Sequence, residues 1–223
     1  MALPAFESTP IETDPGLWSA PDTVIRHEPF EFLVAHNVID PSLHDDLWED
    51  FPKFRGAGYL PYNPEECGPT VNALIDHLTS PAFADRMGEA LGLGNLSRYP
   101  TMVSISRYLK KRHGRIHTDG QSKIATMLLY LNKDWNPREG GCLRFLKSGD
   151  DFNDTVVPEI PPVYGTLACF RRTDCSYHGH LPFQGERHVI QIAWVTDEDQ
   201  KKRKQKRGRW AQKTKEVLSW FRG

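Results

Sequence analysis

The stretch TMVSISRYL, residues 101–109, marks the point at which the sequence changes to strand-like patterning. Four similar stretches follow, separated by clusters of Gly, Pro, Asn and Asp: KIATMLLYLN (123–132), CLRFL (142–146), GTLACF (165–170) and RHVIQIAWV (187–195). All five are short and rich in the β-branched and aromatic residues that favour strands. Their spacing predicts a sandwich or barrel of strands, a jelly roll, over residues 100–196.

The residues before this region are patterned as helices. Asp40 is a good helix N-cap and Pro41 suits a first turn, so a helix is expected to begin here. A second helical stretch covers about residues 71–92, and Pro81 is the position at which it could break. Helices followed by strands predict an α+β fold, with helices from a 22–95 segment packed outside the jelly-roll core.

Length and charge predict one domain with a distinct tail. The 223 residues suit a single domain, which we place at residues 1–199. Residues 200–223 carry ten Lys/Arg and one Glu, so of the 28 bases and 29 acids in the chain, residues 1–199 keep 18 and 28, a balance of -10. The tail is predicted to form a basic C-terminal helix that compensates the acidic body. Its 201–209 run, KKRKQKRGR, leaves nucleic-acid binding as a second interpretation.

Several function classes find no support in the sequence. The four cysteines lack the paired spacings of zinc or redox motifs, so we expect buried free thiols. The N-terminal residues show no basic n-region and no apolar run, which argues against a signal peptide or a membrane span. We therefore expect a cytoplasmic protein without a membrane partner.

The stretch RIHTDG, residues 115–120, carries the first candidate chemistry. In an extended chain the side chains of His117 and Asp119 point to the same side and could bind a single ligand or ion. A second histidine would complete the set of two histidines and one carboxylate that is diagnostic of non-haem Fe(II) oxygenases. Residues 176–195, SYHGHLPFQGERHVIQIAWV, offer three candidates, His178, His180 and His188.

These segments together carry a family resemblance. The motifs HTD (117–119), YLNKDW (130–135) and GGCLRFL (140–146), with a late histidine and Arg187 behind it, resemble the Fe(II)/2-oxoglutarate oxygenases, most closely their prolyl-hydroxylase-like branch. The likeness covers about residues 100–196. It implies a double-stranded β-helix, a cupin-like jelly roll, which agrees with the strand pattern.

The resemblance also implies roles for individual residues. The iron ligands would be His117, Asp119 and His178; His180 lies on the same strand face and stays an alternative, although the spacing to Arg187 favours His178. Arg187 would bind the distal carboxylate of 2-oxoglutarate, since a guanidinium matches a carboxylate bidentately. By position, the resemblance also implies that Tyr130 contacts the same carboxylate, that Thr126 belongs to the pocket wall and that Tyr108 reaches the other end of the co-substrate. From the sequence itself, Arg115 beside the metal strand is a candidate contact for an anionic substrate.

The expected activity follows from these roles. With Fe(II), 2-oxoglutarate and O2 the protein would hydroxylate an unactivated C–H bond, releasing succinate and CO2. A small metabolite or sugar-like molecule is the preferred substrate. The alternatives are a peptidyl-prolyl hydroxylase, whose substrate is a peptide, and a non-catalytic jelly-roll protein that binds an anion through Arg187.

Overall fold

The computed structural model of the protein describes residues 22–197. Its strands are β1 (Val24–Arg26), β2 (Phe32–Ala35), β3 (Leu60–Pro61), β4 (Thr101–Leu109), β5 (Lys123–Tyr130), β6 (Arg144–Leu146), β7 (Leu167–Arg171), β8 (Tyr177–Gly179) and β9 (Gly185–Val195). Its α-helices are α1 (His44–Asp50), α2 (Pro69–Leu78) and α3 (Pro81–Ala90). None of the helices in the described range is long and apolar enough to cross a membrane.

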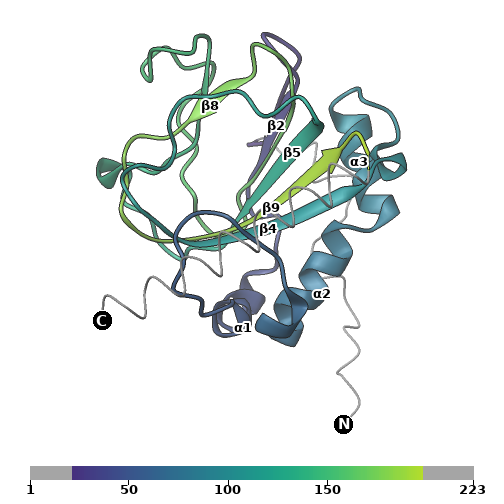
Figure 1. Ribbon diagram of the computed structural model, residues 1–223, viewed down its shortest axis with the longest axis vertical. Coiled ribbons are helices and arrows are strands. Elements are labelled where there is room, and N and C mark those ends of the chain that lie inside the picture. Colours follow the sequence, from purple (N-terminus) through teal and green to yellow (C-terminus); the bar gives the residue numbers. More distant parts are fainter. Residues whose placement is uncertain (1–21, 198–223) are drawn as a thin grey trace.

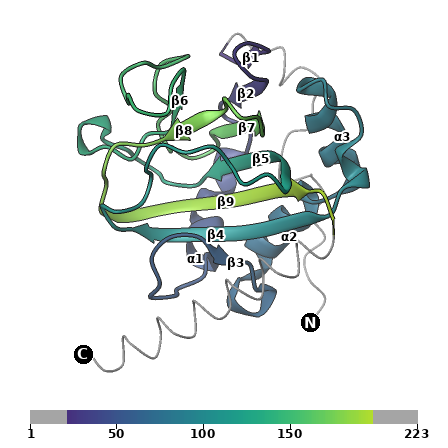
Figure 2. The same cartoon turned by 45° about the horizontal axis from the view of Figure 1, so that its top comes forward.

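The strands form two facing antiparallel sheets. The larger sheet has the order β1-β2-β7-β5-β9-β4-β3, and the smaller one pairs β6 with β8. In Figure 2 the long strands β4 and β9 cross the middle of the molecule, with β6 and β8 on one side and α1 and α2 on the other. This arrangement confirms the predicted double-stranded β-helix and the α+β class.

Alternation along the strands explains why the large sheet has two buried faces. On β5, Ala125, Met127 and Leu129 belong to the cluster that packs against the helices, whereas Leu128 and Tyr130 belong to the cluster between the sheets. The helices therefore cover the outer face of the large sheet, as Figure 1 shows for α2 and α3. The inner face is left to line the space between the sheets.

The residues that were expected to begin or break helices do so in the structure. Asp40 accepts a hydrogen bond from the Ser42 amide (2.9 Å) and caps a short 3-10 turn that leads into α1. The stretch expected at about 71–92 forms two helices, because Pro81 begins α3 and the Ser80 hydroxyl accepts from the Phe83 amide (3.3 Å).

Two expectations need comment. The predicted basic helix at 200–223, with its 201–209 run, lies outside the described residues. All four cysteines are unpaired, but the expectation that they are buried holds only for Cys142 and Cys169; Cys67 is half-buried and Cys175 is exposed.

Candidate metal centre

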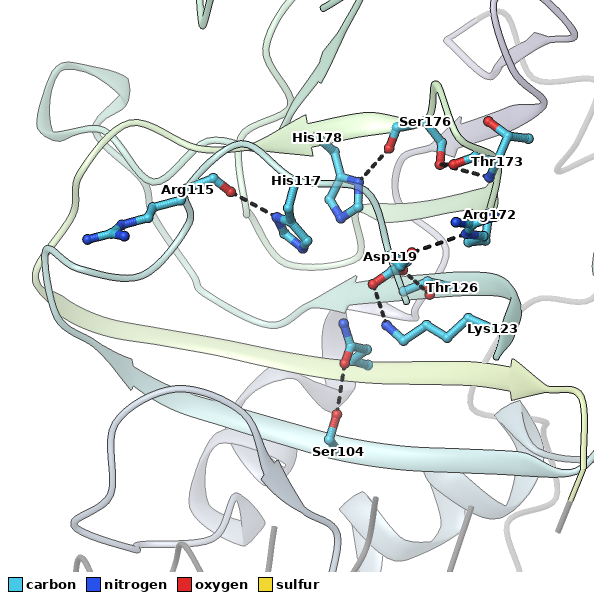
Figure 3. Close-up of polar contacts among 11 residues, drawn as sticks. Ser104, Arg115, His117, Asp119, Lys123, Thr126, Arg172, Thr173, Ser176 and His178 are labelled. Carbon is cyan, nitrogen blue, oxygen red and sulfur yellow. Dashed lines mark hydrogen bonds and ion pairs between the residues drawn. The ribbon is translucent and has the colours of Figure 1, made fainter. Parts of the chain in front are cut away.

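Three side chains from two separate segments meet at the inner face of the molecule. The donor atoms of His117, Asp119 and His178 all lie within 4.8 Å of one another. His117 and Asp119 belong to the connection between β4 and β5, and His178 lies on β8. The backbones of His117 and His178 exchange two hydrogen bonds, of 3.1 and 3.0 Å, which fix one histidine beside the other. Figure 3 shows the two rings and the carboxylate converging.

The hydrogen bonds of both histidines leave one ring nitrogen free for a metal. His117 Nδ1 lies 2.8 Å from the carbonyl oxygen of Arg115, and His178 Nδ1 lies 2.9 Å from that of Ser176. A carbonyl oxygen only accepts, so each Nδ1 must carry the proton and each Nε2 keeps its lone pair. This tautomer is the one that metal-ligating histidines adopt. Burial also lowers the pKa of His178 to about 4, so its imidazole is neutral at pH 7.

The carboxylate of Asp119 is ionised and held at both oxygens. Lys123 Nζ donates to Oδ1 (2.7 Å) and Thr126 Oγ1 donates to Oδ2 (2.6 Å). Burial alone would raise the pKa of Asp119, but the Lys123 ammonium, His178 and the two hydrogen bonds outweigh it and bring the pKa to about 2. Two imidazoles and one carboxylate are a donor set that fits Fe(II).

The three side chains open onto a cavity of about 440 Å³ that also reaches Arg187 on β9. Arg187 is only 2% exposed, and it forms no ion pair with any acidic residue in the described part of the chain. Its Nε donates to the Gly141 carbonyl (3.0 Å), and one Nη lies 3.4 Å from the Tyr130 hydroxyl. A buried guanidinium without an acid is costly, so the cavity suits an anionic ligand.

Three other candidates from the sequence, Tyr130, Thr126 and Arg115, are not among the residues that line this cavity. Tyr130 is fully buried beside Arg187. Thr126 contacts Asp119 and so orients the carboxylate. Arg115 is exposed, and in Figure 3 its side chain points away from the three converging groups; only its carbonyl contributes, through His117.

Tyr108 is not among the residues that line the cavity. The register of β4 against β9 shifts between Ser106 and Tyr108, and beyond the shift Leu109 lines the cavity. Tyr59 lines it as well, because the Gly58 amide donates to the Tyr108 carbonyl (2.8 Å) and ties this loop to the end of β4.

The remaining histidines differ in their surroundings. His180 lines the cavity, and its Nδ1 lies 2.8 Å from the Leu181 carbonyl, the same pattern as in His117 and His178, but it does not join the cluster of three. His188 lies on the opposite face of β9, where its ring stacks on Trp48 (centroids 4.1 Å apart) and Phe51 (4.4 Å). Its position excludes it from the cavity.

Lys123 and Gln191 are cavity residues that the motifs did not indicate. Gln191 follows Arg187 by four residues on β9, so strand alternation alone could have placed both on the inner face. Lys123 had no such signal. It reaches Asp119 because a turn, with the Lys123 amide donating to the Gly120 carbonyl (2.9 Å), folds the chain back.

Comparison with known families agrees with this geometry. Residues 103–196 match the model of the 2OG-Fe(II) oxygenase superfamily, and this range contains all three converging side chains and Arg187. A search of the curated proteins found no match.

Solved structures share the fold. The chain is similar to a prolyl-4-hydroxylase of Pseudomonas putida, with 22% identity and a TM-score of 0.53 over 74% of this chain and 85% of the other. It is also similar to a viral collagen prolyl hydroxylase of Paramecium Bursaria Chlorella virus-1, with 18% identity and a TM-score of 0.50 over 74% and 90% of the two chains.

Proposed function

We propose that the chain is a 2-oxoglutarate-dependent dioxygenase of the 2OG-Fe(II) oxygenase superfamily, whose model matches residues 103–196, and that it hydroxylates a C–H bond of a small metabolite. In this proposal His117, Asp119 and His178 hold Fe(II), and Arg187 with Tyr130 holds the distal carboxylate of 2-oxoglutarate. When bound, the iron supplies the oxidising chemistry that consumes O2 and couples decarboxylation of 2-oxoglutarate to succinate with formation of the substrate hydroxyl.

One observation carries the proposal. The buried guanidinium of Arg187, which pairs with no acidic residue in the described part of the chain, lies in the same cavity as the three metal donors. A distal carboxylate would meet a planar fork of N–H donors and the Tyr130 hydroxyl, both away from bulk water. The side chains thus provide what the reaction asks of the protein: they fix the co-substrate, orient the donors and exclude water.

The size of the cavity supports a small substrate. About 440 Å³ has to accommodate both the co-substrate and the reacting part of the substrate. The alternative, a peptidyl-prolyl hydroxylase, is favoured by the fold shared with the Pseudomonas putida prolyl-4-hydroxylase. Fold alone does not transfer a substrate, so the two must be separated by measurement.

Succinate release is the test. The iron-loaded protein, supplied with 2-oxoglutarate and O2, should form succinate, and a pool of small metabolites should increase the rate more than a pool of proline-containing peptides does. Stimulation by the peptides alone would replace the small-molecule proposal with the prolyl-hydroxylase alternative. No succinate under any condition would contradict the proposed activity.

Replacing Arg187 by Met should weaken 2-oxoglutarate binding about 30-fold or more, since truncating one member of a buried charge pair costs at least about 2 kcal/mol. The matched control is Arg107→Met on β4, whose side chain pairs with Glu186 (3.0 Å) outside the cavity. Isothermal titration with 2-oxoglutarate reads out both variants. Unchanged affinity in Arg187→Met, or equal losses in the two variants, would rule out the assigned role.

A further inference from the structure

The charge of the cavity is unbalanced. Among its lining residues in the described chain, the Asp, Glu, Lys and Arg side chains are Asp119, Lys123 and Arg187. One acid thus faces two bases, so the cavity carries one net positive charge when its histidines are neutral.

Lys123 is part of this imbalance and is enclosed. Its side chain is 10% exposed and that of its partner Asp119 is 9% exposed. Its ammonium donates to an oxygen of the carboxylate that the proposed function assigns to the metal (2.7 Å), as Figure 3 shows. Iron would therefore compete with Lys123 for the negative charge of Asp119.

Loading the site does not remove the imbalance. Fe(II) adds two positive charges and 2-oxoglutarate adds two negative ones, and the distal carboxylate of 2-oxoglutarate is matched to Arg187. One positive charge then remains beside Asp119, shared between the metal and Lys123. A buried ammonium whose partner is shared in this way is costly unless another anion approaches it.

Gln191 adds an uncharged donor to the same cavity. Ser104 Oγ donates to Gln191 Oε1 (3.0 Å), which fixes the amide and leaves its NH2 group without a hydrogen-bond partner among residues 22–197. Gln191 and Lys123 both line the cavity, and neither is a metal ligand or a contact of Arg187. Lys123 thus adds an ammonium and Gln191 an amide N–H to the same cavity.

We propose that Lys123 and Gln191 recognise a carboxylate of the substrate, so that the enzyme acts on a small carboxylic acid. This inference rests on the proposed function and narrows it. An internal proline of a peptide has no free carboxylate to offer, whereas an amino acid or a short aliphatic acid has one.

The cavity rim carries charge of the same sign. The turn that supplies the lining residues His113 and Gly114 also carries exposed side chains of Lys110, Lys111, Arg112 and Arg115. None of these four forms an ion pair with a residue in the described range. A cationic rim on an otherwise acidic body raises the local concentration of anions and would steer an acid into the cavity.

The test measures binding rather than turnover. The full chain is loaded with Mn(II) and saturating 2-oxoglutarate, and thermal shifts and isothermal titrations are recorded with matched probes: butanoate, pentanoate, cyclopentanecarboxylate and L-proline, each against its primary amide. At least one acid should raise Tm and bind at least ten-fold more tightly than its amide, without displacing 2-oxoglutarate.

Substitutions locate the effect. Lys123→Met should reduce acid binding ten-fold or more, Lys123→Arg should retain part of it, and Lys111→Met, at the rim outside the cavity, should change it less than three-fold. The Tm rise caused by 2-oxoglutarate serves as the folding control and should persist in all three variants.

Three results would overturn the inference while leaving the proposed function intact: equal binding of acids and amides, no response to any acid, or full acid binding in Lys123→Met. Absence of the 2-oxoglutarate response in the unmodified protein would instead overturn the proposed function, and the inference with it.

Discussion

At the scale of single residues, Asp119 is the group on which the site depends most. Its two oxygens are held by different partners: Thr126 supplies a neutral hydroxyl and Lys123 a cation. These partners fix the carboxylate before any ligand arrives. The Thr126 hydroxyl orients the carboxylate without competing with a metal for its negative charge. The Lys123 ammonium orients the carboxylate and also competes for that charge.

Thr126→Val tests the orienting role of the hydroxyl. The variant keeps the shape of the side chain but removes the donor, and loss of such an outer partner typically weakens metal binding 10- to 100-fold. We expect Mn(II) affinity, measured by isothermal titration, to fall within that range.

The control for Thr126→Val is Thr166→Val. Thr166 is equally buried, but its hydroxyl lies 3.2 Å from His36 Nδ1, away from the metal donors. Unchanged Mn(II) affinity in Thr126→Val, or the same loss in Thr166→Val, would show that the hydroxyl has no specific role.

At the scale of elements, the turn before His117 is held by close packing. The Gly114 backbone has φ +80°, and a Cβ at this position would overlap the ring of His180. The Gly114 carbonyl accepts from the His180 amide (2.9 Å), so the turn and the segment after β8 support each other.

Gly114→Ala should therefore lower the free energy of unfolding by about 1–3 kcal/mol, since it combines an unfavourable φ with a steric clash. Chemical denaturation checks this value. In the exposed Gly120→Ala control a Cβ meets nothing within 4 Å, and the change should stay within about 0.5 kcal/mol. Similar losses in both variants would contradict the packing argument.

The contact of α1 with β9 predicts a dependence on pH. His188 stacks between Trp48 and Phe51, and both its ring nitrogens lack partners in the described residues. Burial, with a smaller contribution from Arg107, lowers its pKa to about 4. The unfolded chain takes up this proton near pH 6.5, so stability is lost as the pH falls from about 6.5 towards 4, by up to about 3 kcal/mol for this group.

His188→Phe removes the titration and keeps a ring between the two aromatic side chains. Its free energy of unfolding should fall less steeply between pH 6.5 and 4 than that of the unmodified protein. A parallel pH profile for His188→Phe would show that His188 is not the responsible group.

How far the sequence predicts the site depends on whether the signal is local. Two spacings can be read directly from the sequence because each lies within one segment. They are the two-residue step from His117 to Asp119 and the nine-residue step from His178 to Arg187. The position of Tyr108 depends on a register shift between β4 and β9, and that of Tyr59 on a hydrogen bond between two segments. Such features arise only when distant elements pair, so motif reading could not supply them.

At the scale of the whole molecule, the fold was predictable because its main strands are short, rich in β-branched and aromatic residues and separated by turn residues. In the structure, successive residues of β5 and β9 alternate between a helix-covered face and an inner face. The site itself joins β5, β8, β9 and the loop at residues 57–59 across the inner space. Ligands that bind only this assembled cavity should therefore stabilise the entire fold.

Binding of the co-substrate should raise the free energy of unfolding by a predictable amount. With Mn(II) present, 2-oxoglutarate at one hundred times its dissociation constant should raise the free energy of unfolding by about 2.7 kcal/mol. Denaturation with and without 2-oxoglutarate measures it. The increase should be absent when succinamide replaces 2-oxoglutarate, because this probe has neither the keto group nor a carboxylate. An equal increase with both compounds would argue against a site built for the keto acid.

The most direct measurement is a visible absorption spectrum recorded without oxygen. Addition of 2-oxoglutarate to the Fe(II)-loaded protein should produce a weak metal-to-ligand charge-transfer band, and Asp119→Ala should abolish it. No band with the unmodified protein, or an equal band with Asp119→Ala, would contradict the assignment of the three converging side chains to iron.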